Sequence, residues 1–168
     1  IFIVFAVFLL VEKYQLAVTT IAGIYAINYS LTWFTNPWIS RAINCYGERV
    51  VLCMESASLI VLFLGYAFIE NAAVAVCLYV LDSIFFNFAI GLTTYLQKIA
   101  DPKDLAQSTA VGFTINHISA VVIPLCGGAL WLISWRLPFL IGAALAICSF
   151  LFTLRIRVCM NAAGAART

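Results

Sequence analysis

Residues 105–135 are the feature that most constrains this chain, because they contain no aspartate, glutamate, lysine or arginine. A helix needs about 20 mainly apolar residues to cross the hydrocarbon core of a bilayer, so this stretch is long enough to span one. The whole chain is similarly poor in charge: 65% of its residues are hydrophobic and only 10% are charged, whereas a soluble domain has about 25% charged residues. We therefore predict an all-α integral membrane protein.

Further apolar runs flank this stretch on both sides, and short polar joints separate them. The predicted helices cover approximately residues 1–11, 16–39, 50–69, 72–97, 105–133 and 137–154. Because backbone in a bilayer must satisfy its own hydrogen bonds, these runs predict a six-helix transmembrane bundle over residues 1–157. The first run has about half the length of a span, so we expect its helix to be truncated. Residues 158–168 are expected to form a tail.

The joints contain recognisable breaking signals. Pro102 disfavours the helical conformation at Asp101, and we expect Asp104 to cap the next helix. Residues 41–49 are expected to form a polar loop that turns at Gly47.

The basic residues predict the orientation of the bundle. If successive joints alternate between the two membrane surfaces, Lys13 and Arg136 lie on one side, and the other side holds Arg41, Arg49, Lys98, Lys103, Arg155, Arg157 and Arg167. Cytoplasmic joints carry the excess of lysine and arginine. We therefore expect the joints at 41–49 and 98–104 and the C-terminus to face the cytoplasm, across a plasma membrane or a bacterial inner membrane.

Asp82 falls near the middle of its predicted helix. It shares a helix side with Tyr79, Phe86, Thr93 and Gln97, a mixture of aromatic and polar groups that is typical of a cavity wall. A carboxylate at this depth costs roughly 2.5–3.5 kcal/mol unless it faces protein or water. One interpretation is a pathway residue; the other is a neutral acid in a buried hydrogen bond between helices.

His117 is the only histidine, and it follows Asn116 within the charge-free stretch. Histidine changes charge near neutral pH, which suits a proton pathway. The alternative is a neutral imidazole bonded to Asn28 or to a tyrosine of a neighbouring helix. His117 and Asp82 differ in height by roughly 7 Å at 1.5 Å per residue, so we expect two positions in one cavity and not a direct pair.

The second predicted helix carries a polar stripe, since Tyr25, Asn28, Thr32 and Asn36 recur at spacings of three and four. In a bilayer such a stripe turns toward protein, where it either lines a polar pathway or joins helices.

Glu55 and Lys98 lie nearer the ends of their runs. We expect Glu55 to pair with a loop arginine such as Arg49, and Lys98 to extend its ammonium group to the cytoplasmic surface.

No enzyme constellation is present. The chain lacks GxSxG and HExxH, and Ser119 lies on nearly the opposite helix face from His117, so the two do not form a nucleophile and its base. The six cysteines are scattered without a CxxC spacing, which predicts neither disulfides nor metal ligands. The net charge of +2 includes no basic run suited to nucleic acid. We expect no enzymatic activity, metal or cofactor.

The segment NPWISRAINCYGERVVL (36–52) resembles the cytoplasmic loop that is repeated in each half of major facilitator superfamily transporters. That loop runs glycine, three residues, aspartate, a basic residue, any residue, glycine and two basic residues. Gly47 and Arg49 match it, and the places of the first glycine, the acid and two of the bases are taken by Ser40, Asn44, Cys45 and Glu48. The number of runs, the short joints and the orientation are similar too.

The resemblance implies half of a twelve-helix transporter fold: the end of the seventh helix, followed by helices eight to twelve. It implies a missing N-terminal six-helix half and a central cavity that opens alternately to each side, lined by the eighth, tenth and eleventh helices. On these grounds the candidates for a substrate or proton pathway are His117, Asp82, Asn116, Asn28, Tyr25 and Thr32. The candidates for a cytoplasmic gating loop are Arg41, Gly47 and Arg49.

The expected function is secondary active transport of a small solute, with proton coupling as one option. The expected partners are the lipid bilayer, the missing half and a small-molecule substrate, with no nucleic acid. The alternative is a membrane scaffold or partner-binding subunit whose buried polar groups only fix helix packing.

Overall fold

The computed structural model describes residues 3–101 and 103–155. Arg157, Arg167 and the predicted tail lie outside the described residues. Within them every regular element is a helix and no strand is present, which confirms the all-α class. In chain order the elements are α1 (Ile3–Glu12), α2 (Val18–Tyr46), α3 (Glu48–Phe68), α4 (Ala72–Phe86), the 3₁₀ helix η1 (Asn87–Ala89), α5 (Ile90–Ile99), α6 (Leu105–Ile133) and α7 (Leu137–Leu154).

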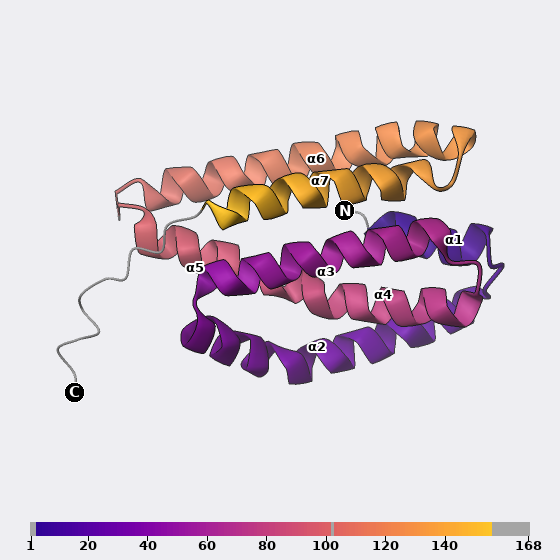
Figure 1. Ribbon diagram of the computed structural model, residues 1–168, viewed down its shortest axis with the longest axis horizontal. Helices are drawn as coiled ribbons and strands as arrows, with labels where there is room; N and C mark the ends of the chain where they lie inside the picture. Colours follow the sequence, from indigo (N-terminus) through magenta and orange to yellow (C-terminus); the bar gives the residue numbers. More distant parts are fainter. Residues whose placement is uncertain (1–2, 102, 156–168) are drawn as a thin grey trace.

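The helices run up and down beside one another (Figure 1). α4, η1 and α5 follow one another without a loop and form one rod, so the described chain comprises six rods. Four of these rods are long and apolar enough to cross a membrane: Glu48–Phe68, Ala72–Ile99, Leu105–Ile133 and Leu137–Leu154. These lengths and compositions are compatible with the predicted membrane-embedded bundle.

α3 lies at the centre of the packed part of the bundle. It packs along α7 and also contacts α2, α4 and α5. The main core cluster joins α1, α2, α3, α4 and α7, with Leu9, Tyr66, Tyr79 and Phe139 among its most buried members. In α7 the buried face also includes small residues, Gly142, Ala143 and Ala146. Small residues let two helix backbones approach closely.

α2 is longer than predicted. The helix continues through residues 41–46, so the expected polar loop at 41–49 is wrong. The reason is burial: Ile39 and Ile43, four residues apart, pack with Val51 of α3 and extend the apolar face beyond the predicted end. The predicted turn at Gly47 is confirmed, because this single residue separates α2 from α3. Its φ of +81° and ψ of 159° belong to a region that is essentially restricted to glycine.

The rod predicted over residues 72–97 is interrupted by η1. There the Asn87 side chain donates one hydrogen bond to the Ser83 carbonyl (2.9 Å) and another to Thr32 Oγ1 of α2 (3.2 Å). The break in the regular helix therefore coincides with a polar contact between two rods.

The start of α6 differs from the prediction at its cap. Asp104 occupies the N-cap position, but its backbone is already helical and its side chain makes no cap hydrogen bond, so capping by Asp104 is wrong. Asp101 organises the turn instead. Its carboxylate accepts from the Lys103 backbone N–H (3.0 Å), and its carbonyl accepts from the N–H groups of Asp104 and Leu105.

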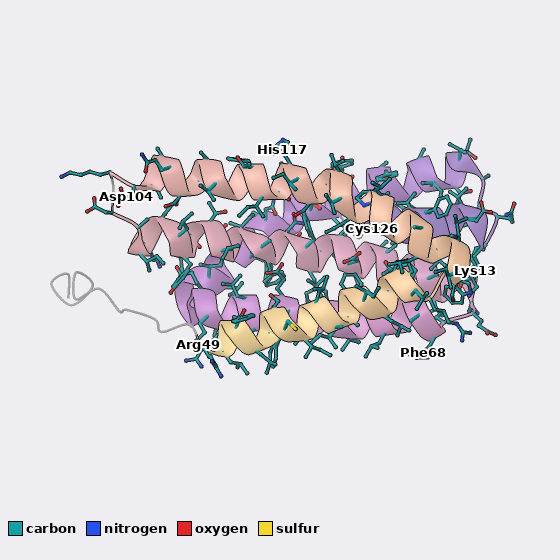
Figure 2. All side chains as sticks on the ribbon, turned by 90° about the horizontal axis from the view of Figure 1, so that it is seen from above. Lys13, Arg49, Phe68, Asp104, His117 and Cys126 are labelled. Atoms are coloured by element: carbon teal, nitrogen blue, oxygen red, sulfur yellow. The ribbon has the colours of Figure 1, made fainter. Side chains whose placement is uncertain are left out.

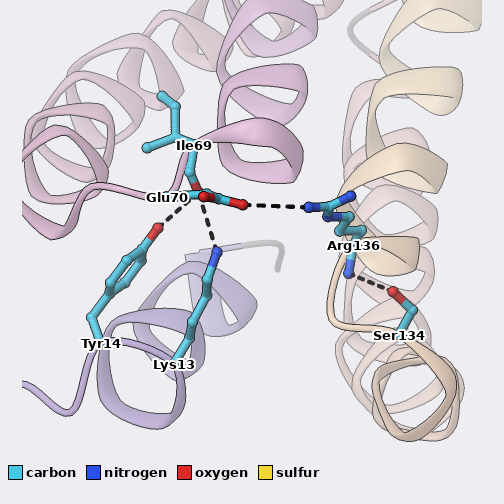
Figure 3. A network of polar contacts seen from close by, with 6 residues as sticks. All are labelled: Lys13, Tyr14, Ile69, Glu70, Ser134 and Arg136. Carbon is cyan, nitrogen blue, oxygen red and sulfur yellow. Dashed lines mark hydrogen bonds and ion pairs between the residues drawn. The ribbon is translucent and has the colours of Figure 1, made fainter.

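Three joints meet at one end of the bundle (Figure 3). Lys13 Nζ and Tyr14 Oη both donate to the Ile69 carbonyl, at 3.2 and 2.8 Å, and Arg136 lies 3.8 Å from a Glu70 carboxylate oxygen. Partial burial lowers the pKa of Lys13 and raises that of Tyr14, and both shifts favour the neutral forms. The joints after α1, α3 and α6 are thus held together, as the predicted alternation requires.

α6 is the least covered of the long helices. Its main neighbour is α7, and Gly127 is its one buried residue within the described chain. At Gly127 the ring of Phe5 from α1 packs directly on the helix backbone, so an added side-chain carbon would overlap that ring. At Gly128 the same position is open.

This contrast gives a prediction for the docking of α6. Gly127→Ala should lower the free energy of unfolding by about 1–3 kcal/mol, because Phe5 is buried and has little room to move. Gly128→Ala should be neutral or stabilising by up to about 1 kcal/mol, as expected for an exposed helical glycine. Denaturation of the purified chain in detergent micelles measures both. Equal effects at the two positions would contradict the Phe5 contact.

Candidate functional site

The polar stripe of α2 faces α4 and η1. Asn28 Nδ2 donates to Ser83 Oγ at 2.9 Å, and Asn87 Nδ2 donates to Thr32 Oγ1 at 3.2 Å. One turn before Asn28, the ring of Tyr25 packs edge to face on the ring of Tyr79 of α4, with centroids 6.1 Å apart. Three predicted site residues therefore lie in one seam between α2 and the α4 rod.

A cavity of about 280 Å³ opens in this seam. Its wall combines aromatic rings with amides and hydroxyls, and it contains no carboxylate, ammonium, guanidinium or imidazole group; the lining residues are Tyr25, Asn28, Tyr29, Thr32, Tyr79, Ser83, Phe86 and Asn87. Asn28 is only 6% exposed, and its Oδ1 atom has no hydrogen-bond partner among the residues that the structure describes. The wall thus holds a buried acceptor that needs a donor.

Asp82 lies behind this wall and does not line the cavity. It is 2% exposed, and its Oδ2 atom has no hydrogen-bond partner within residues 3–101 and 103–155. Tyr66 of α3 has an equally buried hydroxyl without a partner in the same ranges. The carboxylate is close enough to act electrostatically on Tyr66 and Tyr79. Asp82 therefore faces protein, at the contact between α3 and α4.

The helix side predicted to accompany Asp82 is divided between two cavities. Tyr79 and Phe86 line the α2–α4 cavity, whereas Thr93 and Gln97 line a second one between α5 and α6. The second cavity has a volume of about 470 Å³ and also lacks charged groups; its wall comprises Leu92, Thr93, Leu96, Gln97, Leu105, Ser108, Thr109, Gly112, Phe113 and Asn116. Among the predicted site residues, Asn116 belongs to this wall.

His117 lies apart from both cavities. Its side chain is exposed, and Figure 2 shows it pointing away from the other helices. Its Nδ1 atom is 2.8 Å from the Phe113 carbonyl of the same helix. Neither of these two cavities contains both His117 and Asp82, and the alternative bond of His117 to Asn28 or a tyrosine is wrong. Helical spacing gives the relative height of two residues, but the rotation of α6 depends on its contacts with α7 and α1.

The candidate gating residues lie at the end of the bundle opposite the joint cluster. Arg41 is exposed on the last turns of α2. Arg49 donates from its guanidinium to the Leu154 carbonyl at the end of α7, at 2.7 Å. The expected pairing of Arg49 with Glu55 is therefore not what the structure shows.

An ion pair that the sequence did not indicate fixes the same end. Glu48, buried in the first turn of α3, pairs with Lys98 in the last turn of α5. The carboxylate suits the positive end of the α3 dipole. Lys98 therefore does more than extend to the surface: it connects α5 to the α2–α3 turn. The available signal was an acidic residue directly after a glycine turn.

Three cavity residues were missed by the sequence analysis: Tyr29 of α2, and Ser83 and Asn87 of the α4 rod. Ser83 and Asn87 follow Tyr79 at intervals of four, which places them on the same face of the rod as Tyr79. That spacing is the signal that would have found them. No group of three or more metal-ligating side chains is gathered within the part of the chain that the structure describes.

Comparisons of this chain with protein-family models, curated proteins and solved structures gave no match.

The Glu48–Lys98 pair gives a second prediction. Lys98→Met should cost about 1–3 kcal/mol of unfolding free energy, because it leaves a buried carboxylate unpaired; the cost is below that of a fully buried pair since the Lys98 side chain is 59% exposed. Adding Glu48→Gln should recover part of this loss.

The matched control is Lys103→Met, which removes an exposed lysine of the same joint. Chemical denaturation in detergent micelles gives the four free energies of the double-mutant cycle. Equal costs for Lys98→Met and Lys103→Met, with no coupling to Glu48, would contradict a stabilising pair.

Proposed function

We propose that this chain is one six-helix half of a membrane-embedded secondary transporter that moves a small solute by alternating access. The observation that carries the proposal is the α2–α4 cavity, whose wall sets amides and hydroxyls among aromatic rings, beside a rod that is long and apolar enough to cross a membrane. Polar groups at membrane depth are costly unless they meet protein or water. The sequence of residues 36–52, around the Gly47 turn, resembles a loop of major facilitator superfamily transporters and supports the same assignment.

The arrangement of the joints supports the orientation that we propose. The α2–α3 turn, the α5–α6 joint and the end of α7 lie at one end of the bundle (Figure 1). The basic side chains in or beside them are Arg41, Arg49, Lys98, Lys103 and Arg155, against Lys13 and Arg136 at the opposite end. We assign the more basic end to the cytoplasmic face of a plasma membrane or bacterial inner membrane.

The second half of the transporter would complete the cavities. Alternating access requires two bundles that rock around a shared site. α2 and α6 expose large apolar side chains, including Trp33, Phe34, Val111 and Phe113, which are available to lipid and to the second bundle. Proton coupling is an additional option in this proposal, with Asp82 as its best-placed carboxyl group.

A membrane scaffold is the competing function. It is favoured by the direct bonds Asn28–Ser83 and Asn87–Thr32, because such pairs also join helices without any passage. The two functions differ in whether water reaches the seam.

Cysteine accessibility distinguishes them. In a full-length protein whose native cysteines are replaced, Ser83→Cys should react with a charged, membrane-impermeant thiol reagent on the order of tenfold faster than Leu81→Cys, because only a thiol in contact with water ionises. Ser83 lines the cavity, and Leu81 is exposed on nearly the opposite face of the same helix at the same depth.

The measurement is the rate of labelling in intact membrane vesicles, with reagent added to each side in turn. Reaction from either side supports a passage. Labelling of Ser83→Cys that is as slow as that of Leu81→Cys from both sides would favour the scaffold.

A further inference from the structure

We infer that the α2–α4 cavity takes an uncharged solute that carries hydroxyl groups around a compact apolar ring or chain. This inference rests on the proposed function, since it names the chemical class of the solute that the transporter moves. Three properties of the wall lead to it: the absence of charge, an acceptor without a donor, and the mixture of rings with polar groups.

The part of the wall that this chain supplies offers no counter-charge to an ionic solute. None of the eight side chains that line the cavity carries a charge near neutral pH. An ion that left water for this wall would lose its hydration without gaining a counter-charge, and that cost is large in an apolar environment. Asp82, the nearest carboxyl group along the rod, is buried and lies outside the wall.

The hydrogen-bonding groups of the wall select a donor. Asn28 Nδ2 is engaged by Ser83, and Asn87 Nδ2 is shared between Thr32 and the Ser83 carbonyl. The amide nitrogens are therefore occupied, while Asn28 Oδ1 is buried and has no partner within the described residues. A buried acceptor of this kind is satisfied when a ligand hydroxyl donates to it.

The aromatic part of the wall suits carbon–hydrogen surface. Tyr25, Tyr29, Tyr79 and Phe86 contribute rings beside the amides, so the wall offers apolar area and hydrogen bonds together. The volume of about 280 Å³ lies just below the roughly 300 Å³ at which pockets for drug-sized ligands begin. A single-ring sugar or a cyclic polyol matches both the size and the chemistry.

Three solutes with one carbon skeleton test the charge requirement. D-glucose, D-gluconate and D-glucosamine are neutral, anionic and cationic, and myo-inositol is a second neutral probe. Each is added to vesicles of full-length protein with Ser83→Cys as its only cysteine, and the rate of labelling by the impermeant thiol reagent is measured. A neutral probe at about ten times its Kd should slow labelling about tenfold, since the occupied cavity is closed to the reagent.

We expect D-glucose or myo-inositol to protect the thiol and the two charged analogues not to. Stronger protection by gluconate or glucosamine, or protection by none of the four, would overturn the inference while leaving the passage intact. Absence of labelling without any solute would instead overturn the proposed function, so the two failures are distinguishable.

A second variant ties protection to the unpartnered acceptor. Asn28→Ala in the Ser83→Cys protein should lose protection by the neutral probes, measured as the ratio of the labelling rates with and without each probe in the same variant. Asn44→Ala, at an exposed position near the end of the same helix, should keep that protection. Gel filtration checks that each variant remains folded, and Asn28→Leu, which removes the acceptor but keeps the side-chain volume, replaces Asn28→Ala if that variant aggregates. Unchanged protection in the folded variant would overturn the role of Asn28.

Discussion

Polar groups that lie between apolar helices must find partners within the protein, because hydrocarbon supplies none. This requirement applies to side chains as well as to the backbone. The side chains of α2 that cannot face lipid turn toward α4, where Asn28 meets Ser83 and Thr32 meets Asn87. The seam between these rods therefore combines hydrogen-bonding side chains from both helices. Among the described residues, Asn28 Oδ1 in the cavity wall and Asp82 Oδ2 behind it are buried without a partner, so the bundle by itself does not satisfy the rule there.

The two ends of the bundle are fixed by different chemistry. At one end, the Ile69 carbonyl accepts hydrogen bonds from Lys13 and Tyr14, and Glu70 pairs with Arg136, so three joints are held together. At the other, a buried ion pair joins Glu48 to Lys98, and Arg49 caps the end of α7. The contacts at the first end connect joints to one another. The contacts at the second end connect the start of α3 to the ends of α5 and α7. The Glu48–Lys98 and Arg49–Leu154 contacts therefore fix the positions of α5 and α7 relative to α3 at the more basic end.

Much of this could be predicted from the sequence, because charge depletion and helical spacing act locally. The helical class, the turn at Gly47 and the inward polar stripe of α2 follow from neighbouring residues. The extension of α2 to Tyr46 could not be predicted, since it depends on packing of Ile43 against Val51 of the next helix. The outward position of His117 depends on how few helices cover α6. The Glu48–Lys98 pair joins residues that are distant in sequence, which no periodicity reveals.

The 3₁₀ turn at residues 87–89 lets one rod serve two neighbours. Before it, α4 walls the space shared with α2; after it, α5 walls the space shared with α6, on the opposite flank (Figure 1). A sideways translation of the whole rod would enlarge one cavity and shrink the other. A rotation of the rod about η1 would instead enlarge both cavities or shrink both. The two cavities share this rod as a wall, so a displacement of the rod would change the volumes of both.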